Sequence, residues 1–148
     1  MRLNKFILIA VGALAHLLNV ATAGACDLKV ESGWIRELPP TVTSLAAYAT
    51  LTNTGVKRVE ITAISTKAAE MAMLHETTVK NGLSQMRMLS SLSIAPGAEV
   101  TLAPSGKHLM LTGLKGMPKA GDHVTISFTD ASGCVTEADF SVRSSMSN

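Results

Sequence analysis

Short apolar or alternating runs, separated by turn residues, recur along most of this chain and constrain its fold more than any other feature. The connecting segments read LPPT, NTG, NG, APG, PSG, KAGD and DASG, which are turn sequences. We find no convincing amphipathic helix between them, and many short strands at near-regular spacing are typical of an all-β sandwich. The predicted strands are residues 28–36, 45–53, 58–65, 72–79, 83–90, 99–103, 107–114, 123–130 and 135–142.

The first 25 residues have the layout of a secretory signal peptide. Arg2 and Lys5 precede an apolar run, and small residues follow it. We expect residues 1–25 to be removed, with cleavage after Ala23 or Ala25, and residues 26–148 to form one domain. A membrane anchor is the main alternative, but the apolar run is short for a spanning helix. Lipid attachment at Cys26 is less favoured, because Ala23 stands where such sites prefer a large aliphatic residue.

Charge excludes some partners of the exported chain. Of the 13 Lys and Arg residues, two lie in the signal segment, so the remainder balances the 11 Asp and Glu residues. No basic patch remains to indicate nucleic acid or a membrane surface as a partner. We therefore expect no nucleic-acid binding, no membrane insertion of the exported chain, and a monomer.

The two cysteines, Cys26 and Cys134, are far apart in the sequence. In an oxidising export compartment a structural disulfide is the leading interpretation of such a pair. A metal-thiolate role is less favoured, because neither cysteine has a second ligand at a short, regular spacing.

The run GKHLML, residues 106–111, places two metal donors on one side of a predicted strand. Successive side chains of a strand point to opposite faces, so His108 and Met110 share one face while two leucines share the other. Imidazole and thioether both bind borderline-to-soft metal ions. One such pair is more often ordinary packing, so the rest of the chain has to supply matching donors.

A second strand segment offers those donors. Asn81-Gly82 is a strong signal for a two-residue hairpin turn, which would pair His75 with Met88 and put Met86 diagonal to His75 on the same face. A four-residue loop would also leave His75 and Met86 on one face, whereas a three-residue bulged loop would separate them. Methionines usually pack in cores, and we expect core positions for Met71 and Met73. For Met88, core packing and a place in the site are equally favoured.

Together the two segments would form a site of two imidazoles and two thioethers. These neutral, soft donors suit Cu(I) far better than Zn(II), Mg(II) or Ca(II). Thioethers also remain usable in an oxidising compartment, where paired thiols become disulfides.

The spacing H-x10-M-x21-H-x-M, from His75 to Met110, resembles the motif of the periplasmic copper chaperones of the PCuAC family. The segments GWIRELPP, AAYATLTNTG, MLHET, PSGKHLMLTGLK and KAGDHVTISF also resemble that family, in order, over nearly the whole exported chain.

This resemblance implies a cupredoxin-like or immunoglobulin-like Greek-key β-sandwich that carries copper without catalysis. It implies one Cu(I) per chain on His75, Met86, His108 and Met110. Met88, which the hairpin register places on the same face, is a possible extra ligand. It also implies a periplasmic location and delivery to the dinuclear copper centre of cytochrome c oxidase, alongside a Sco-type thiol protein.

The chain departs from the family pattern at three places. Ser105 stands where the family often has a second glycine, and the two cysteines are not part of the common pattern. Some members carry a His- and Met-rich C-terminal extension that binds a second copper ion. Here the tail offers only Met146, so we expect no second site there.

Three other functions compete with a copper carrier. A blue-copper electron carrier needs a Cys thiolate with two His and an axial Met, and Cys134 has no His or Met at short spacing after it. A secreted β-sandwich interaction module would use the Met and His face as ordinary core. A hydrolase would need a Ser-His-Asp or paired-carboxylate arrangement that the sequence does not offer, so we expect no enzyme activity.

Overall fold

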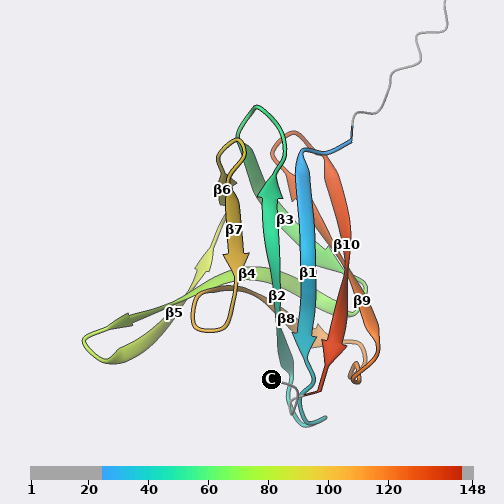
Figure 1. Cartoon of the computed structure of the whole chain (residues 1–148). Helices are drawn as coiled ribbons and strands as arrows, with labels where there is room; N and C mark the ends of the chain where they lie inside the picture. The colour runs from blue at the N-terminus through green and yellow to red at the C-terminus, as the bar shows by residue number, and fades with distance from the viewer. Residues whose placement is uncertain (1–24, 145–148) are drawn as a thin grey trace, which may run out of the picture.

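The computed structural model describes residues 25–144, and these form ten strands (Figure 1). The predicted signal segment therefore lies outside the described residues, apart from Ala25. In chain order the strands are β1 (Leu28–Arg36), β2 (Ser44–Asn53), β3 (Val59–Thr66), β4 (Ala69–Lys80), β5 (Leu83–Leu89), β6 (Leu92–Ile94), β7 (Glu99–Leu102), β8 (Lys107–Leu114), β9 (His123–Asp130) and β10 (Val135–Arg143).

The all-β class is confirmed, and the predicted runs correspond to nine of these strands with end shifts of up to three residues. The sequence analysis missed β6, whose three residues are too few to show an alternating pattern. Among residues 25–144 no helix is long and apolar enough to cross a membrane.

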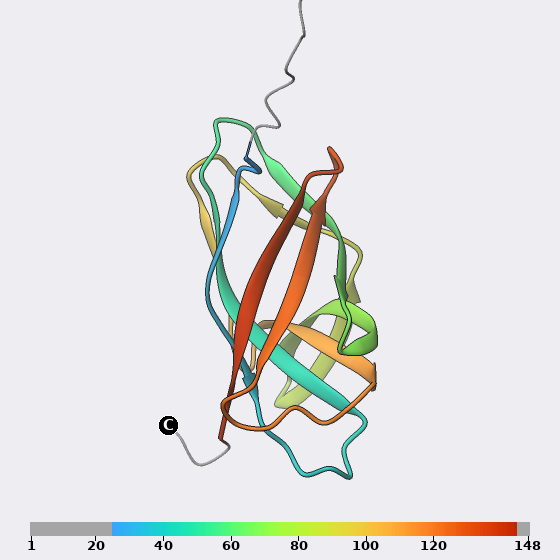
Figure 2. The same ribbon diagram turned by 90° about the vertical axis from the view of Figure 1, so that its right-hand side faces the viewer.

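The strands follow one continuous hydrogen-bonded path, in the order β5-β4-β8-β2-β1-β10-β9-β3-β6, with β7 also paired to β2. All pairings are antiparallel except that of β1 with β10, which is parallel. The path folds round on itself, so β10 and β9 lie over β2 and β8 (Figure 2). The sandwich is therefore a single wrapped sheet.

Alternation along the strands directs one set of side chains to a common core. In β2 every second residue from Leu45 to Asn53 is buried. Trp34 is not in this core. It lies half-buried on the outer face of β1, against Tyr48 of β2, with ring centroids 4.5 Å apart. The fully buried large side chains are Phe128, Phe140, Ile35, Leu45, Leu51, Ile94, Leu102, Leu109, Leu111, Ile126 and Asn53.

The β4–β5 hairpin turns through Asn81 and Gly82, as the two-residue loop requires. Both have positive φ, 52° and 76°, which glycine adopts freely and asparagine tolerates. Thr77 pairs with Met86, so the two-residue register is confirmed and the three- and four-residue loops are wrong. The tip of this hairpin projects beyond the sandwich body (Figure 1), and Val79 is 71% exposed there.

The structure joins Cys26 to Cys134 by a disulfide, with Cα atoms 5.8 Å apart, as the cysteine count predicts. The bridge ties the start of the described chain to the start of β10. Because both cysteines of the chain lie in this bridge, neither offers a thiolate to a metal ion.

Candidate metal centre

Two histidines from neighbouring strands face each other on the outer side of the sheet. His75 of β4 is directly opposite His108 of β8, and their ring centroids are 5.9 Å apart with an 83° angle between the planes. The next residues along, Leu74 and Leu109, are paired on the other side, where both are buried in the core. Strand alternation thus places both imidazoles together on the face away from the core.

The loop before β8 fixes the orientation of His108. Its Nδ1 is 3.0 Å from the carbonyl oxygen of Gly106. A carbonyl can only accept, so Nδ1 carries the proton, and in the neutral ring Nε2 keeps a free lone pair. The same carbonyl accepts a hydrogen bond from the backbone N–H of Thr77, at 3.0 Å, which ties the loop to β4. His108 itself is only 5% exposed.

His75 is held in a form that suits metal binding. Its Nδ1 is buried without a hydrogen-bond partner among the described residues. Burial lowers the pKa of His75 below its usual value, and a charge on His108 lowers this pKa further. The imidazole therefore stays neutral, with a lone pair available, to more acidic pH than an ordinary histidine.

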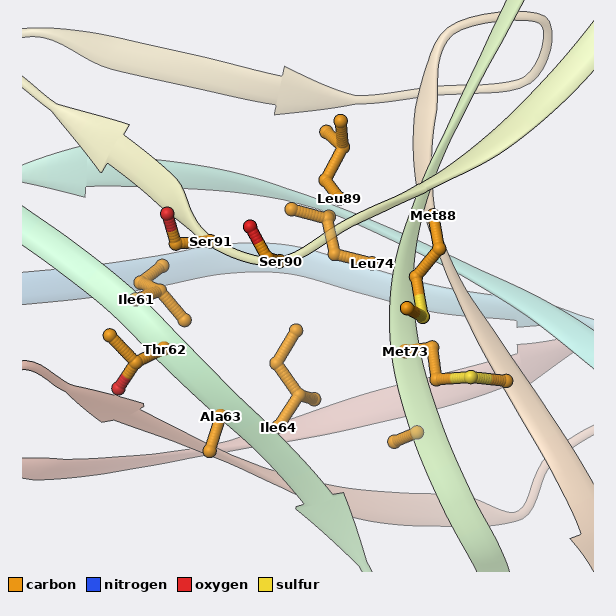
Figure 3. Close-up of a pocket in the computed structure, with 11 residues that line it drawn as sticks. Ile61, Thr62, Ala63, Ile64, Met73, Leu74, Met88, Leu89, Ser90 and Ser91 are labelled. Carbon is orange, nitrogen blue, oxygen red and sulfur yellow. The ribbon is translucent and has the colours of Figure 1, made fainter.

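Five methionines lie on the same outer face of β4, β5 and β8 as the two histidines, and we call this surface the His/Met face. Its pairs are Met88 with His75, Met73 with Met110, Met86 with Thr77, and Met71 with Thr112. Met73 and Met88 both project away from the side of β4 where Leu74 and Ile64 lie (Figure 3). Met71 is 55% exposed and Met73 is half-buried outside the core, so the core positions expected of both are wrong. Both residues point away from the side of β4 that carries the buried Leu74.

The structure brings the four predicted ligands to one face but not to one point. His75 and His108 are in contact distance of each other, and Met110 is two residues along β8 on the same side. Met86 is paired with Thr77, and the N–H of Thr77 donates a hydrogen bond to the carbonyl of Gly106. Met86 is therefore level with Gly106, which is four residues before Met110 in the chain, or about 13 Å at about 3.3 Å per residue.

Met88 is better placed than Met86, because it is directly opposite His75 while Met86 is diagonal to it. Opposed residues have Cβ atoms about 5 Å apart, and diagonal ones about 7–8 Å. Coordination by Met86 together with Met110 requires the hairpin to curl toward β8. The assignment of Met86 stays a prediction, with Met88 as its direct competitor.

On the reverse side of the same three strands, one carboxylate links all of them. Glu76 of β4 contacts Arg87 of β5 at 2.6 Å and Lys107 of β8 at 2.9 Å. The Lys107 hydrogen bond, then that of Arg87, holds the pKa of Glu76 below its usual value. The Glu76–Arg87 pair thus joins β4 to β5, and Lys107 extends it to the strand that carries His108.

The sequence analysis missed the aromatic neighbours of the site. Ala46 of β2 pairs with Met110, so Tyr48, two residues further, lies on the same outer face toward His108. Tyr48 contacts Trp34, and the Arg143 guanidinium is 5.3 Å from the Trp34 ring centroid. Burial raises the pKa of Tyr48, and Arg36 opposes this. Alternation in residues 44–53 could have placed Tyr48 on one face, but not beside His108.

Within residues 25–144, no three His, Cys, Asp or Glu side chains gather in a way that could hold a metal ion. An apolar pocket of about 310 Å³ lies nearby, between β3 and the β4–β5 hairpin. Met73 and Met88 border this pocket, but neither histidine lines it (Figure 3). The pocket is therefore adjacent to the His/Met face and distinct from the histidine pair.

Comparison with known proteins places this chain in a family. The family model described as "Putative lipoprotein LpqE-like" matches residues 28–142. The protein named "Putative lipoprotein Lxx21020" from Leifsonia xyli subsp. xyli is 35% identical over 127 residues, which cover 82% of this chain and 75% of that protein.

Solved structures of copper-binding domains share the fold. The Cu(I) form of DR1885 from Deinococcus radiodurans has a TM-score of 0.66 and 31% identity, covering 85% of each chain. The copper-bound PCuAC domain from PmoF2 has a TM-score of 0.68 and 16% identity, covering 82% of this chain and 96% of that one. These findings confirm the resemblance to the PCuAC family, and the chain belongs to the LpqE-like family and has the fold of the PCuAC domains.

Proposed function

We propose that this protein is a copper chaperone that carries one Cu(I) ion on the His/Met face and passes it to a copper enzyme. The observation that carries the proposal is the opposed pair of His75 and His108, each with a ring nitrogen free to bind, on a face lined by five methionines. Imidazole and thioether donors select a soft monovalent ion. The similar solved structures include copper-bound and Cu(I) forms.

The ligand set we propose is His75, His108 and Met110, with Met86 completing it and Met88 as its competitor. All of these donors are neutral, so they bind Cu(I) less tightly than thiolates, which favours release to an acceptor. The disulfide leaves no thiolate for a blue-copper site, so an electron carrier of that kind is not supported. Binding and release of an ion require no catalytic residues, and we propose no enzyme activity.

Location and acceptor follow from resemblance. The matched family and relative are described as lipoproteins, which supports export to the cell envelope, and we propose the periplasm. We propose the dinuclear copper centre of cytochrome c oxidase as the acceptor, with a Sco-type thiol protein alongside. Incubation of the Cu(I)-loaded protein with the purified apo copper-bearing domain, then separation and metal analysis, tests the transfer.

The ligand assignment is tested by anaerobic Cu(I) titration with native mass spectrometry. We expect one tightly held Cu(I) per chain in the wild type. The double variant Met86→Leu/Met110→Leu should lose more than about 100-fold in affinity, beyond what loss of an outer partner costs, with unchanged circular dichroism. The single variants Met86→Leu and Met88→Leu then show which of the two methionines binds.

Met117→Leu is the matched control, because Met117 lies in the loop between β8 and β9, outside the strands of the His/Met face. A double variant with wild-type affinity would show that the ligand assignment is wrong. A wild-type protein that binds no Cu(I) would overturn the proposed function itself.

A further inference from the structure

Two methionines of the His/Met face have no role in the proposed site. Met73 is directly opposite Met110, and Met71 is two residues further along β4 on the same side. A four-donor site that uses both histidines needs Met110 and one of the two hairpin methionines. Met71 and Met73 are not needed and therefore call for a separate explanation.

Core packing does not explain them. The core side of this part of β4 and β8 is occupied by Leu74, Leu109 and Leu111, all of them buried. Met71 points the other way and is 55% exposed. Solvent-facing strand positions favour β-branched and aromatic residues, so consecutive outward methionines are not what strand formation selects.

The positions of these residues allow three thioethers to meet. Met73 and Met110 are an opposed pair, with Cβ atoms about 5 Å apart, and Met71 is diagonal to Met110 at about 7–8 Å. A methionine side chain has three rotatable bonds and adapts readily to a shared partner. Three thioethers and no charged donor form a position that selects a soft monovalent ion.

We propose that Met71, Met73 and Met110 form a second, all-thioether position for Cu(I), next to the histidine pair, through which the ion leaves. This inference rests on the proposed function and concerns the route of the ion. Met110 belongs to both positions, so the ion moves by exchanging one donor at a time while Met110 stays bound. Copper remains Cu(I), every donor is neutral, and no electron or proton is transferred in the exchange.

The test follows each methionine separately by NMR of protein labelled with ¹³C at the methionine methyl groups. Ag(I), a soft ion that cannot be oxidised by air, is the probe. In the wild type, the first equivalent should shift the Met110 signal together with Met86 or Met88, and further Ag(I) should shift Met71 and Met73. In His75→Leu/His108→Leu, the first equivalent should shift Met71, Met73 and Met110 together.

A kinetic measurement tests the route. In Met71→Leu/Met73→Leu, the rate of Cu(I) transfer to a competing chelator should fall about tenfold, equivalent to about 1.4 kcal/mol of barrier, while equilibrium affinity stays within about twofold. Met117→Leu should change neither quantity.

The outcomes separate this inference from the proposed function. If Met71 and Met73 shift no more than Met117 in both proteins, the second position does not exist, whether or not the histidine site binds. Unchanged transfer kinetics in Met71→Leu/Met73→Leu would show that the thioethers are not on the exit route. If no methionine signal of the wild type shifts with Ag(I), the proposed function fails as well.

Discussion

At the scale of single residues, the backbone carbonyl of Gly106 decides how His108 can act. This carbonyl accepts a hydrogen bond from Nδ1 of His108, which leaves Nε2 as the metal-binding atom. It also accepts a hydrogen bond from the backbone N–H of Thr77, which places Nε2 of His108 against β4. Ser105, just before it, has a φ of 65°, in the left-handed region that favours glycine. This conformation explains why glycine suits the position. Serine adopts the same conformation at a cost in backbone strain.

We expect Ser105→Gly to keep the loop and to leave stability unchanged or raise it by up to about 1.5 kcal/mol. A residue with a side chain pays about 1–2 kcal/mol for left-handed backbone, and glycine avoids this cost. The greater conformational entropy of glycine in the unfolded chain cancels about 0.5–1 kcal/mol of the resulting stabilisation. Ser105→Val, with a branched side chain, should lower both stability and copper affinity. Urea unfolding and Cu(I) titration of both variants check this. A valine variant as stable as the glycine variant would contradict the expected strain.

Copper affinity should fall on acidification, because protons compete with Cu(I) at both imidazoles. The pKa of His75 is lowered by burial and by His108, so competition at His75 begins below about pH 6.5, the usual histidine value. Each histidine ligand that must be deprotonated to bind the ion adds up to about one decade per pH unit to the limiting slope, so two such ligands give about two. In His108→Met, the slope of copper affinity against pH should approach about one decade per pH unit, because one histidine ligand remains. Cu(I) competition titrations at several pH values give both slopes, and equal slopes would mean that His108 is not a ligand.

At the scale of strands, Glu76 joins β5, β4 and β8 on the side opposite the His/Met face. The folded-state pKa of this carboxyl is lowered, so the stabilisation is fully present above its unfolded pKa, about 4.5, and is lost as the pH falls through the folded value. Glu76→Gln should therefore lower the Tm at pH 7, by a few degrees at most for an exposed network.

Thermal unfolding at pH 7 and pH 3 tests this account. The difference in Tm between wild type and Glu76→Gln should shrink at the lower pH. Glu99→Gln on β7 is the matched control, because that carboxylate is outside the network. An equal difference at both pH values would mean that the charge of Glu76 is not the cause.

Much of this element-level arrangement could be predicted from the sequence, because alternation and turn residues are local signals. Asn81-Gly82 favoured the two-residue turn, whose register puts His75 beside Met88, over the longer loops that the sequence left open. Pairing between β4 and β8 is not local, so no pattern showed that His75 faces His108 or that Met73 faces Met110. Met71 was misplaced for the same reason, since one strand alone does not reveal which of its faces is covered.

At the scale of the whole molecule, the disulfide spans 108 residues and links the beginning of the domain to β10. On the chain-entropy model, closing a loop of this length stabilises the fold by about 3–5 kcal/mol. Cys26→Ser/Cys134→Ser should lose about that amount in urea unfolding, with copper affinity little changed, because the bridge is remote from the His/Met face.

Intact mass of the exported protein, before and after alkylation without reductant, tests the bridge directly. A disulfide gives no alkylation, and it excludes a lipid on the sulfur of Cys26, although related proteins are described as lipoproteins. Two alkylated cysteines, or a lipid-sized mass increase, would contradict the bridge.

The parallel pairing of β1 with β10 has a consequence for the timing of folding. The first described strand, β1, pairs along one edge with the last described strand, β10, so that edge of β1 stays open until β10 has been synthesised. Contacts this distant in sequence form slowly, and an open edge invites pairing with other chains. The strands of the His/Met face, β4, β5 and β8, lie between these two in the sequence and pair with one another. The strands of the His/Met face can therefore pair with one another before β10 closes the sandwich.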